Sequence, residues 1–345
     1  MDRLTIKMGD SDTRRILKKK ELKIGPYTLS APLTMLNGGF SKWGFCTRDG
    51  IEFFIKEFLS PVYPTDDSTL EKDISERKIK QCMDWFQKKK RLYLHIMRAQ
   101  NGNIIAPLSL FQSNSHYYII TEKVNGYSLN DVMEELDDRS KFIILKVLAD
   151  CFNRLAKENI VHADVKPDNI IIKPTIDGCF TAKVIDFDAG YLENDPPDCE
   201  EIQGDAVYFA PETFLYMMEE PVTLTSKVDI FALGIIFHQI LCGEFPIFSA
   251  EYDYIYEAVL DGSEIVLSNK LTPEFQDLIR NMLNPEPEER FSADIVYMAL
   301  DQIENGTYKT SEENKFSEES YLPIESIPVN VTANKGRFKR TNSFD

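Results

Sequence analysis

The chain has 345 residues, of which 56 are acidic and 39 are Lys or Arg, so its formal net charge is −17. With 43% hydrophobic and 28% charged residues, its composition is that of an average globular protein, which excludes collagen, a coiled coil and wholesale disorder. The length suggests two domains or one large domain with two lobes, enough to bury a sizeable core.

The charge is unevenly distributed. Residues 1–124 carry a net charge of +7, whereas residues 125–305 carry −24. Such a negative surface argues against generic nucleic-acid binding, which needs Lys and Arg to neutralise phosphates. It permits basic protein partners or substrates.

The first third of the chain has the pattern of a sheet with one helix. Residues 1–23 are polar and basic and are expected to form a flexible lead or one short helix. Strand-like segments follow at 27–36, 42–46, 51–59, 103–111 and 116–124, and Asp49-Gly50 is a hairpin signal. Apolar spacing predicts a helix over 69–98, which at about 45 Å is long enough to suggest a kink or an extra helix.

After Gly126 the pattern becomes mainly helical. Helices are expected at 142–156, 228–242, 250–260, 273–283 and 292–303, with short strands near 170–172 and 182–185. From residue 305 onward the chain loses periodicity and is expected to be disordered. This order predicts a small β-rich lobe, a connector and a larger helical lobe, with a ligand cleft between the lobes.

Nothing in the sequence indicates a membrane or an oxidising compartment. The strongest apolar stretch, 228–242, is too short to span a bilayer, and the N-terminus has no apolar run typical of a signal peptide. The six cysteines show no disulfide framework or metal spacing. A cytoplasmic protein is therefore expected.

Four elements, in order along the chain, concentrate polar chemistry. Gly38-Gly39 lies in a strand-turn-strand segment where backbone N–H groups could approach phosphates, and Lys56 lies in an apolar strand. The segment His-Ala-Asp-Val-Lys-Pro-Asp-Asn, 162–169, enters an apolar strand, and a second strand ends in Asp-Phe-Asp, 186–188. An aspartate and an asparagine supply the hard oxygen ligands that suit Mg²⁺.

These motifs resemble those of the protein kinase superfamily, specifically Hanks-type (bacterial-like) Ser/Thr protein kinases, over residues 24–303. Ala-Pro-Glu at 210–212, the Asp229 to Gly234 motif and Arg290 corroborate the resemblance. It implies an α+β bilobal fold: an antiparallel-sheet N-lobe at 24–121, a hinge at 122–126 and a mainly helical C-lobe at 127–303. Residues 1–23 would be an N-terminal extension and 304–345 a disordered C-terminal tail.

The resemblance also implies a role for each motif residue. Asp164 would accept or orient the proton of the substrate hydroxyl, and Lys166 would neutralise charge on the moving phosphoryl group. The cofactors would be ATP and Mg²⁺, with Mn²⁺ as an alternative. Asn169 and Asp186 would hold the metal. Lys56 would bind the α- and β-phosphates, and Gly38 and Gly39 would also approach the phosphates. The backbones of Glu122 and Val124 would bind adenine, with Thr121 beside them as the gatekeeper. Substrates would be proteins, basic ones being favoured by the acidic C-lobe, with no nucleic acid or membrane involved; the oligomeric state stays open.

The sequence departs from the family pattern at several positions. Ala163 replaces the arginine that usually receives an activating phosphate, and residues 191–207 contain no Ser or Thr, so a non-RD kinase without phosphosites there is expected. Asp188 replaces a glycine and would either ligate a second metal ion or point to solvent. Asp205 replaces a threonine and could pair with Lys166.

The helix glutamate expected to pair with the strand lysine cannot be placed, because residues 89–92 read Lys-Lys-Arg-Leu. The basic cluster at 88–91 could be a solvated face or a docking surface, and we expect a solvated face. Two alternatives to an active protein kinase stay open: a small-molecule kinase of the aminoglycoside or choline kinase type, and a catalytically weak pseudokinase scaffold.

Overall fold

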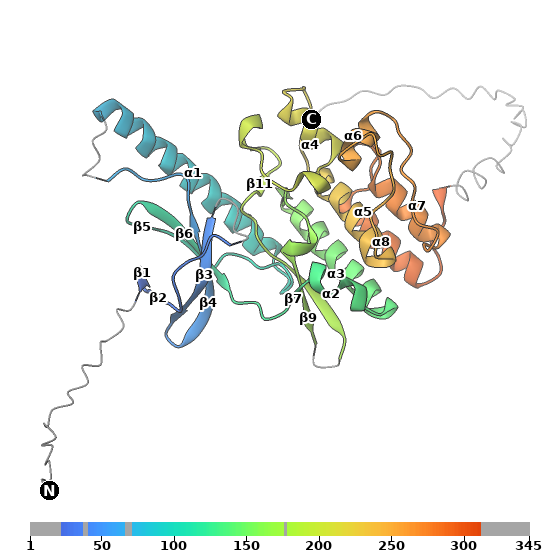
Figure 1. Ribbon diagram of the computed structural model, residues 1–345, viewed down its shortest axis with the longest axis horizontal. Helices are drawn as coiled ribbons and strands as arrows, with labels where there is room; N and C mark the ends of the chain where they lie inside the picture. Colours follow the sequence, from blue (N-terminus) through green and yellow to red (C-terminus); the bar gives the residue numbers. More distant parts are fainter. Residues whose placement is uncertain (1–21, 37–40, 66–70, 176–177, 312–345) are drawn as a thin grey trace, which may run out of the picture. The chain divides into compact units, whose positions relative to one another are not determined.

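The computed structural model describes residues 22–36, 41–65, 71–175 and 178–311 (Figure 1). Two compact units are distinguished, 1–308 and 309–345, and every element discussed here belongs to the first. Gly38 and Gly39 lie outside the described residues, as do almost all of the predicted N-terminal extension and most of the predicted tail.

The first lobe is built on a six-stranded antiparallel sheet with the strand order β1-β2-β3-β4-β6-β5 (Figure 1). Asp49 and Gly50 both have positive φ, 52° and 79°, as a two-residue hairpin turn requires, and they bring Arg48 opposite Ile51. The predicted hairpin is therefore confirmed. The strands are β1 Lys23–Ile24, β2 Tyr27–Leu29, β3 Ser41–Arg48, β4 Ile51–Phe58, β5 Ser109–Ser113 and β6 His116–Glu122.

A single helix, α1 Lys72–Ala99, accompanies this sheet (Figure 1). Its 28 residues form one uninterrupted helix of about 42 Å, so the expectation of an extra helix or a kink is wrong. Its buried residues concentrate in the second half, where Leu92, Tyr93 and Ile96 join the main core. The first half is mostly exposed.

The second lobe is mainly helical and is organised around α5 Lys227–Cys242, which is buried on almost all sides. Gly234 lets α7 approach α5, because a Cβ at this position would lie 3.1 Å from the Cβ of Met282. The structure adds α2 and α4, neither of which was predicted, and α6 begins five residues later than expected. The other helices are α2 Leu129–Val132, α3 Asp138–Lys157, α4 Pro211–Met217, α6 Ile255–Leu260, α7 Pro273–Met282 and α8 Ala293–Glu304.

Short strands connect the lobes and carry the polar motifs. The main chain of Val184 bonds with Asn103 and Ile105, which lie between α1 and β5, so the second predicted motif strand is fixed to the first lobe. These short strands are β7 Tyr127–Ser128, β8 Ile160–Val161, β9 Ile170–Pro174, β10 Phe180–Val184 and β11 Tyr191–Leu192.

The two lobes confirm the predicted α+β fold, with a small antiparallel-sheet lobe and a larger, mainly helical one. Among the described residues, no helix combines the length and apolarity that crossing a bilayer would require.

Candidate active site

The loop between β8 and β9 is held in place by a buried aspartate. The carboxylate of Asp229, in α5, accepts hydrogen bonds from the backbone N–H groups of His162 at 2.8 Å and Ala163 at 3.0 Å. Ala163 has a φ of 66°, a region that residues other than glycine rarely occupy. Such a conformation persists only where the surroundings enforce it, and the two bonds to Asp229 supply that constraint.

Within this loop, Asp164 is the centre of a polar cluster. Its carboxylate is 2.9 Å from the Nζ of Lys166, and its Oδ2 accepts a hydrogen bond of 2.8 Å from the Nδ2 of Asn169. The same Nδ2 also donates to the main-chain oxygen of Asp164 at 2.7 Å. The Asp164 side chain is partly exposed, so a substrate hydroxyl could reach a carboxylate that its neighbours hold in one orientation.

The second cluster joins β4 to the end of β10. Lys56, only 8% exposed, donates to both carboxylate oxygens of Asp186 at 2.8 Å, and its Nζ is 2.7 Å from Oδ2 of Asp188. Asp186 has a φ of 65°, a second strained backbone position. Between the two aspartates, Phe187 is buried against the ring of His162, with ring centroids 4.6 Å apart, which links this turn to the loop that carries Asp164.

Burial and charge act in opposite directions on this cluster. Burial lowers the pKa of Lys56, but the charges of Asp188 and Asp186 outweigh it and hold the pKa above its ordinary value. Burial would raise the pKa of Asp186, yet Lys56 keeps it below its usual range. Burial and the neighbouring Asp186 raise the pKa of Asp188.

The structure therefore gives Asp188 a role that neither expectation included. Its carboxylate does not point to solvent but pairs with Lys56, while its main-chain oxygen accepts a hydrogen bond from Lys89 of α1. Sequence reasoning missed this acidic partner of Lys56. The sequence nevertheless contains a signal. A lysine, Lys89, occupies the region expected for a glutamate, and an aspartate, Asp188, occupies the position expected for a glycine. The first change replaces a negative charge with a positive one, and the second adds a negative charge.

The basic cluster at 88–91 is not simply a solvated face. Lys88 and Arg91 lie 3.2 Å and 2.6 Å from the carboxylate of Asp195, which follows β11, although both basic side chains are more than half exposed. The solvated-face expectation therefore fits Lys88, Lys90 and Arg91, which are exposed, and is wrong for Lys89, which contacts Asp188.

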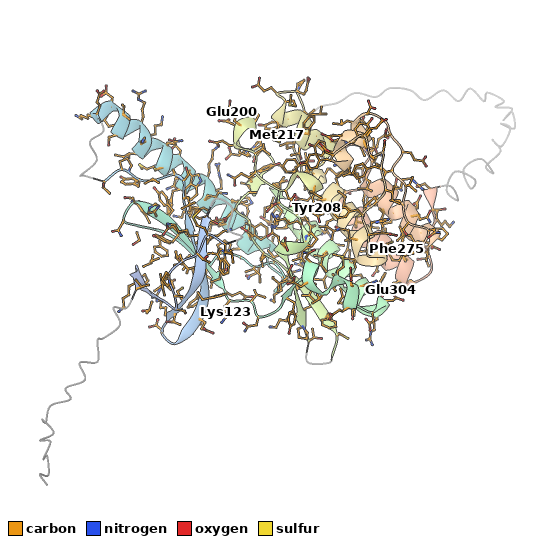
Figure 2. All side chains as sticks on the ribbon, viewed as in Figure 1. Lys123, Glu200, Tyr208, Met217, Phe275 and Glu304 are labelled. Atoms are coloured by element: carbon orange, nitrogen blue, oxygen red, sulfur yellow. The ribbon has the colours of Figure 1, made fainter. Side chains whose placement is uncertain are left out.

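The segment that leads to α4 also differs from expectation at Asp205. Lys166 pairs with Asp164, while the side chain of Asp205 accepts a hydrogen bond of 3.1 Å from the N–H of Val207 and caps a short turn at 206–208. Tyr208, labelled in Figure 2, fixes this turn to α5 through a hydrogen bond of 3.3 Å to Gln239.

The predicted adenine contacts lie where the sheet ends. Glu122 is the last residue of β6, and Val124 follows it in the connection to the second lobe. Lys123, labelled in Figure 2, lies over the ring of Phe45 and pairs with Glu52 at 3.1 Å, which anchors the connection to β3 and β4.

The donor set fits a magnesium nucleotide. Mg²⁺ is usually held by one or two protein oxygens together with phosphate oxygens and water, and Asp186 with the side-chain oxygen of Asn169 could supply such a pair. The described residues contain no group of three His, Cys, Asp or Glu side chains able to hold a metal alone.

The hydroxyl of Tyr93, in α1, is buried and has no hydrogen-bond partner among the described residues. Burial raises the pKa of this hydroxyl, and the negative charges of Asp188 and Asp186 raise it further.

Comparison with known proteins finds similarity to protein kinases. Residues 65–300 match the protein kinase domain model, and Lys56 lies outside the matched range. The chain is similar to a probable myosin light chain kinase of Dictyostelium discoideum, with 26% identity over 57% of this chain and 64% of that protein. It is also similar to serine/threonine-protein kinase DCLK3 of Mus musculus, with 28% identity over 59% of this chain and 26% of the relative. Serine/threonine-protein kinase cds1 of Schizosaccharomyces pombe is 28% identical over 64% of this chain and 50% of that protein. The matches thus span less than two thirds of each of these relatives.

Proposed function

Because the chain belongs to the protein kinase family, we propose that it transfers the γ-phosphoryl group of ATP to serine or threonine hydroxyls of protein substrates. The observation that carries this proposal is the Asp164 carboxylate, held by Lys166 and Asn169 within 3.0 Å. We take residues 24–303 as the catalytic domain and keep the boundaries stated above for its lobes and hinge.

Each polar residue then has a defined task. Asp164 accepts or orients the proton of the attacking hydroxyl, and Lys166 offsets the charge of the transferred group. Asn169 and Asp186 would hold Mg²⁺, with Mn²⁺ as an alternative, and the metal supplies charge neutralisation at the phosphates. Binding of ATP falls to Lys56, Gly38 and Gly39 at the phosphates, and to the backbones of Glu122 and Val124 at adenine.

Catalysis would arise from positioning and electrostatics rather than from covalent chemistry. The bonds from Lys166 and Asn169 fix the Asp164 carboxylate before the substrate arrives, and Asp229 fixes the loop beneath it. The strongly negative second lobe favours substrates with basic residues near the phosphorylated hydroxyl. The lysine two residues after Asp164 supports serine and threonine over tyrosine as acceptors.

We also propose that activity does not need phosphorylation of the segment 191–207. This segment has no Ser or Thr, and Ala163 cannot bind a phosphate. Asp195 already pairs with Lys88 and Arg91, as a phosphate on this segment would be expected to pair with basic residues.

The first test is phosphoryl transfer from labelled ATP with Mg²⁺ to a basic protein, followed by identification of the modified amino acid. Asp164→Asn should lower kcat by roughly 10²–10⁴-fold, because a positioned base contributes that much. Binding of ATP should persist, since Asp164 has no predicted contact with adenine or metal. Asp131→Asn, at an exposed position in α2, is the matched control. An Asp164→Asn protein with full activity would contradict the assignment of the loop.

The same assay separates the alternatives. Transfer to small hydroxylated molecules but not to proteins would indicate a small-molecule kinase. Nucleotide binding without transfer to any acceptor, before and after phosphatase treatment, would favour a scaffold. Full activity after phosphatase treatment is the result that we expect.

A further inference from the structure

The charges around Lys56 are arranged in an order that the proposed function does not by itself explain. In protein kinases, a strand lysine pairs with a glutamate of the helix beside the sheet, and this pair must form for catalysis. Here the helix contributes Lys89, and the carboxylate partners of Lys56 are Asp186 and Asp188.

Lys89 and Asp188 are joined directly. The ammonium group of Lys89 donates to the main-chain oxygen of Asp188, so α1 is attached to the turn after β10 at the residue whose side chain pairs with Lys56. Two basic and two acidic side chains, those of Lys56, Lys89, Asp186 and Asp188, thus meet in one partly buried cluster.

Removal of either partner would leave this cluster unbalanced. Without the carboxylate of Asp188, the carboxylate of Asp186 alone would offset the positive charges of Lys56 and Lys89 in this cluster. With a carboxylate in place of Lys89, three acidic groups would face Lys56 alone. Buried or partly buried charges that lose their partner are strongly unfavourable, so the identity of residue 89 should depend on that of residue 188.

We propose that Asp188 is the residue that positions Lys56 for the nucleotide phosphates, and that Lys89 is its obligate counterpart on α1, so that acid and base have exchanged places between helix and turn. This inference rests on the proposed function, because it assigns Lys56 to the phosphates. It makes Asp188 and Lys89 positioning residues: the lysine is aligned by the turn that carries Asp186, and α1 is attached by its own lysine.

The exchange predicts a specific pattern in a double-mutant cycle. Asp188→Gly and Lys89→Glu should each lower kcat/KM for ATP and weaken MgATP binding by roughly 10²-fold, the order expected when a buried charge loses its partner. The double variant Lys89→Glu/Asp188→Gly moves the carboxylate back to the helix. It should recover to within about tenfold of the wild type, instead of showing the product of the two losses.

Conservative variants separate positioning from folding. Lys89→Arg should remain close to the wild type, whereas Lys89→Met should behave like Lys89→Glu. Lys90→Glu makes the same charge change one residue further along, at an exposed position, and should have no effect. Thermal unfolding of each variant monitors the fold, and Asp188→Asn replaces Asp188→Gly if the glycine variant does not fold.

Calorimetric MgATP binding is measured together with kcat and KM, and it does not require a phosphate acceptor. A failure of the proposed function therefore leaves the binding cycle interpretable. Additive losses in the double variant would overturn the inference, as would unchanged MgATP affinity in both Asp188 variants. An Asp188→Asn protein that differs only in needing more Mg²⁺ for half-maximal rate would assign Asp188 to a metal and would also overturn it.

Discussion

At the scale of single residues, Lys56 is the most constrained group of the site. Its ammonium group lies within 2.8 Å of two carboxylates that follow one another closely in the chain. A phosphate that reaches Lys56 therefore competes with groups already bound to it. Under the proposed function, a metal held by Asp186 would offset part of the charge of that carboxylate and so ease this competition.

His238 provides a residue-scale prediction about pH. It is 1% exposed, its Nδ1 donates to the main-chain oxygen of Glu244 at 2.8 Å, and its Nε2 accepts from the N–H of Ser268 at 3.0 Å. Because the Ser268 N–H is a donor, the ring is neutral, and burial lowers its pKa below the ordinary 6.5.

The unfolded chain therefore binds a proton at His238 more readily than the folded protein does. The contribution of this group to the free energy of unfolding should be complete above pH 6.5 and should be lost as the pH falls below it. Urea unfolding of wild type and His238→Gln between pH 5 and 8 would measure this contribution, because Gln does not titrate. A stability difference that stays constant across this range would contradict the prediction.

At the scale of elements, α1 connects the sheet lobe with two segments of the other lobe. Its second half packs into the core, Lys89 holds the turn at Asp188, and Lys88 with Arg91 holds Asp195. These ion pairs fix the helix to the segment after β11. Glu193, in the same segment after β11, attaches this segment to the start of α5, since its side chain accepts a hydrogen bond of 2.7 Å from the N–H of Ser226.

Asp195→Asn should loosen this connection and lower the activity. Each exposed ion pair contributes about 0.2–1 kcal/mol, so loss of both should reduce kcat/KM by roughly 2- to 30-fold. The effect should shrink as salt is raised, because the partners are solvent-exposed. Asp198→Asn, an exposed aspartate in the same segment, is the control. Equal losses in both variants would show that the pairing of Asp195 is not the cause.

At the scale of the whole molecule, a buried ion pair joins segments far apart in the chain. Arg290, 2% exposed, binds the carboxylate of Glu212 at the start of α4 through two hydrogen bonds of 2.6 and 2.9 Å. It also donates to the main-chain oxygens of Lys227, Asn284 and Pro285. The start of α4 is thereby attached to the start of α5 and to the segment after α7.

Arg290→Lys should be strongly destabilising despite keeping the positive charge. A lysine lacks the planar set of donors, so Glu212 and several buried carbonyl groups would lose their partners. Loss of one partner from a buried pair costs about 3–5 kcal/mol in the free energy of unfolding, which denaturant titration would detect. Arg280→Lys, on the exposed side of α7, should change the stability by less than about 0.5 kcal/mol. Comparable values for the two variants would rule out the proposed role of Arg290.

The sequence by itself determined the fold class, the order of most elements and the family, because these depend on local patterns. The Asp49-Gly50 hairpin and the long α1 follow from residues adjacent in the chain. The cluster of Asp164, Lys166 and Asn169 follows in the same way, since its members lie within six consecutive residues of one loop. Spacing along the chain was sufficient to place these groups.

Only the tertiary structure decided which charges meet around Lys56. Its partners are 130 and 132 positions away in the sequence, and the residue that replaces the expected glutamate is attached to a main-chain oxygen rather than to a side chain. A sequence shows that Lys89 and Asp188 depart from the family pattern, but not that the two departures occupy one space. Their contact depends on how α1 and β10 pack, and long-range packing is set by the whole core rather than by any local pattern.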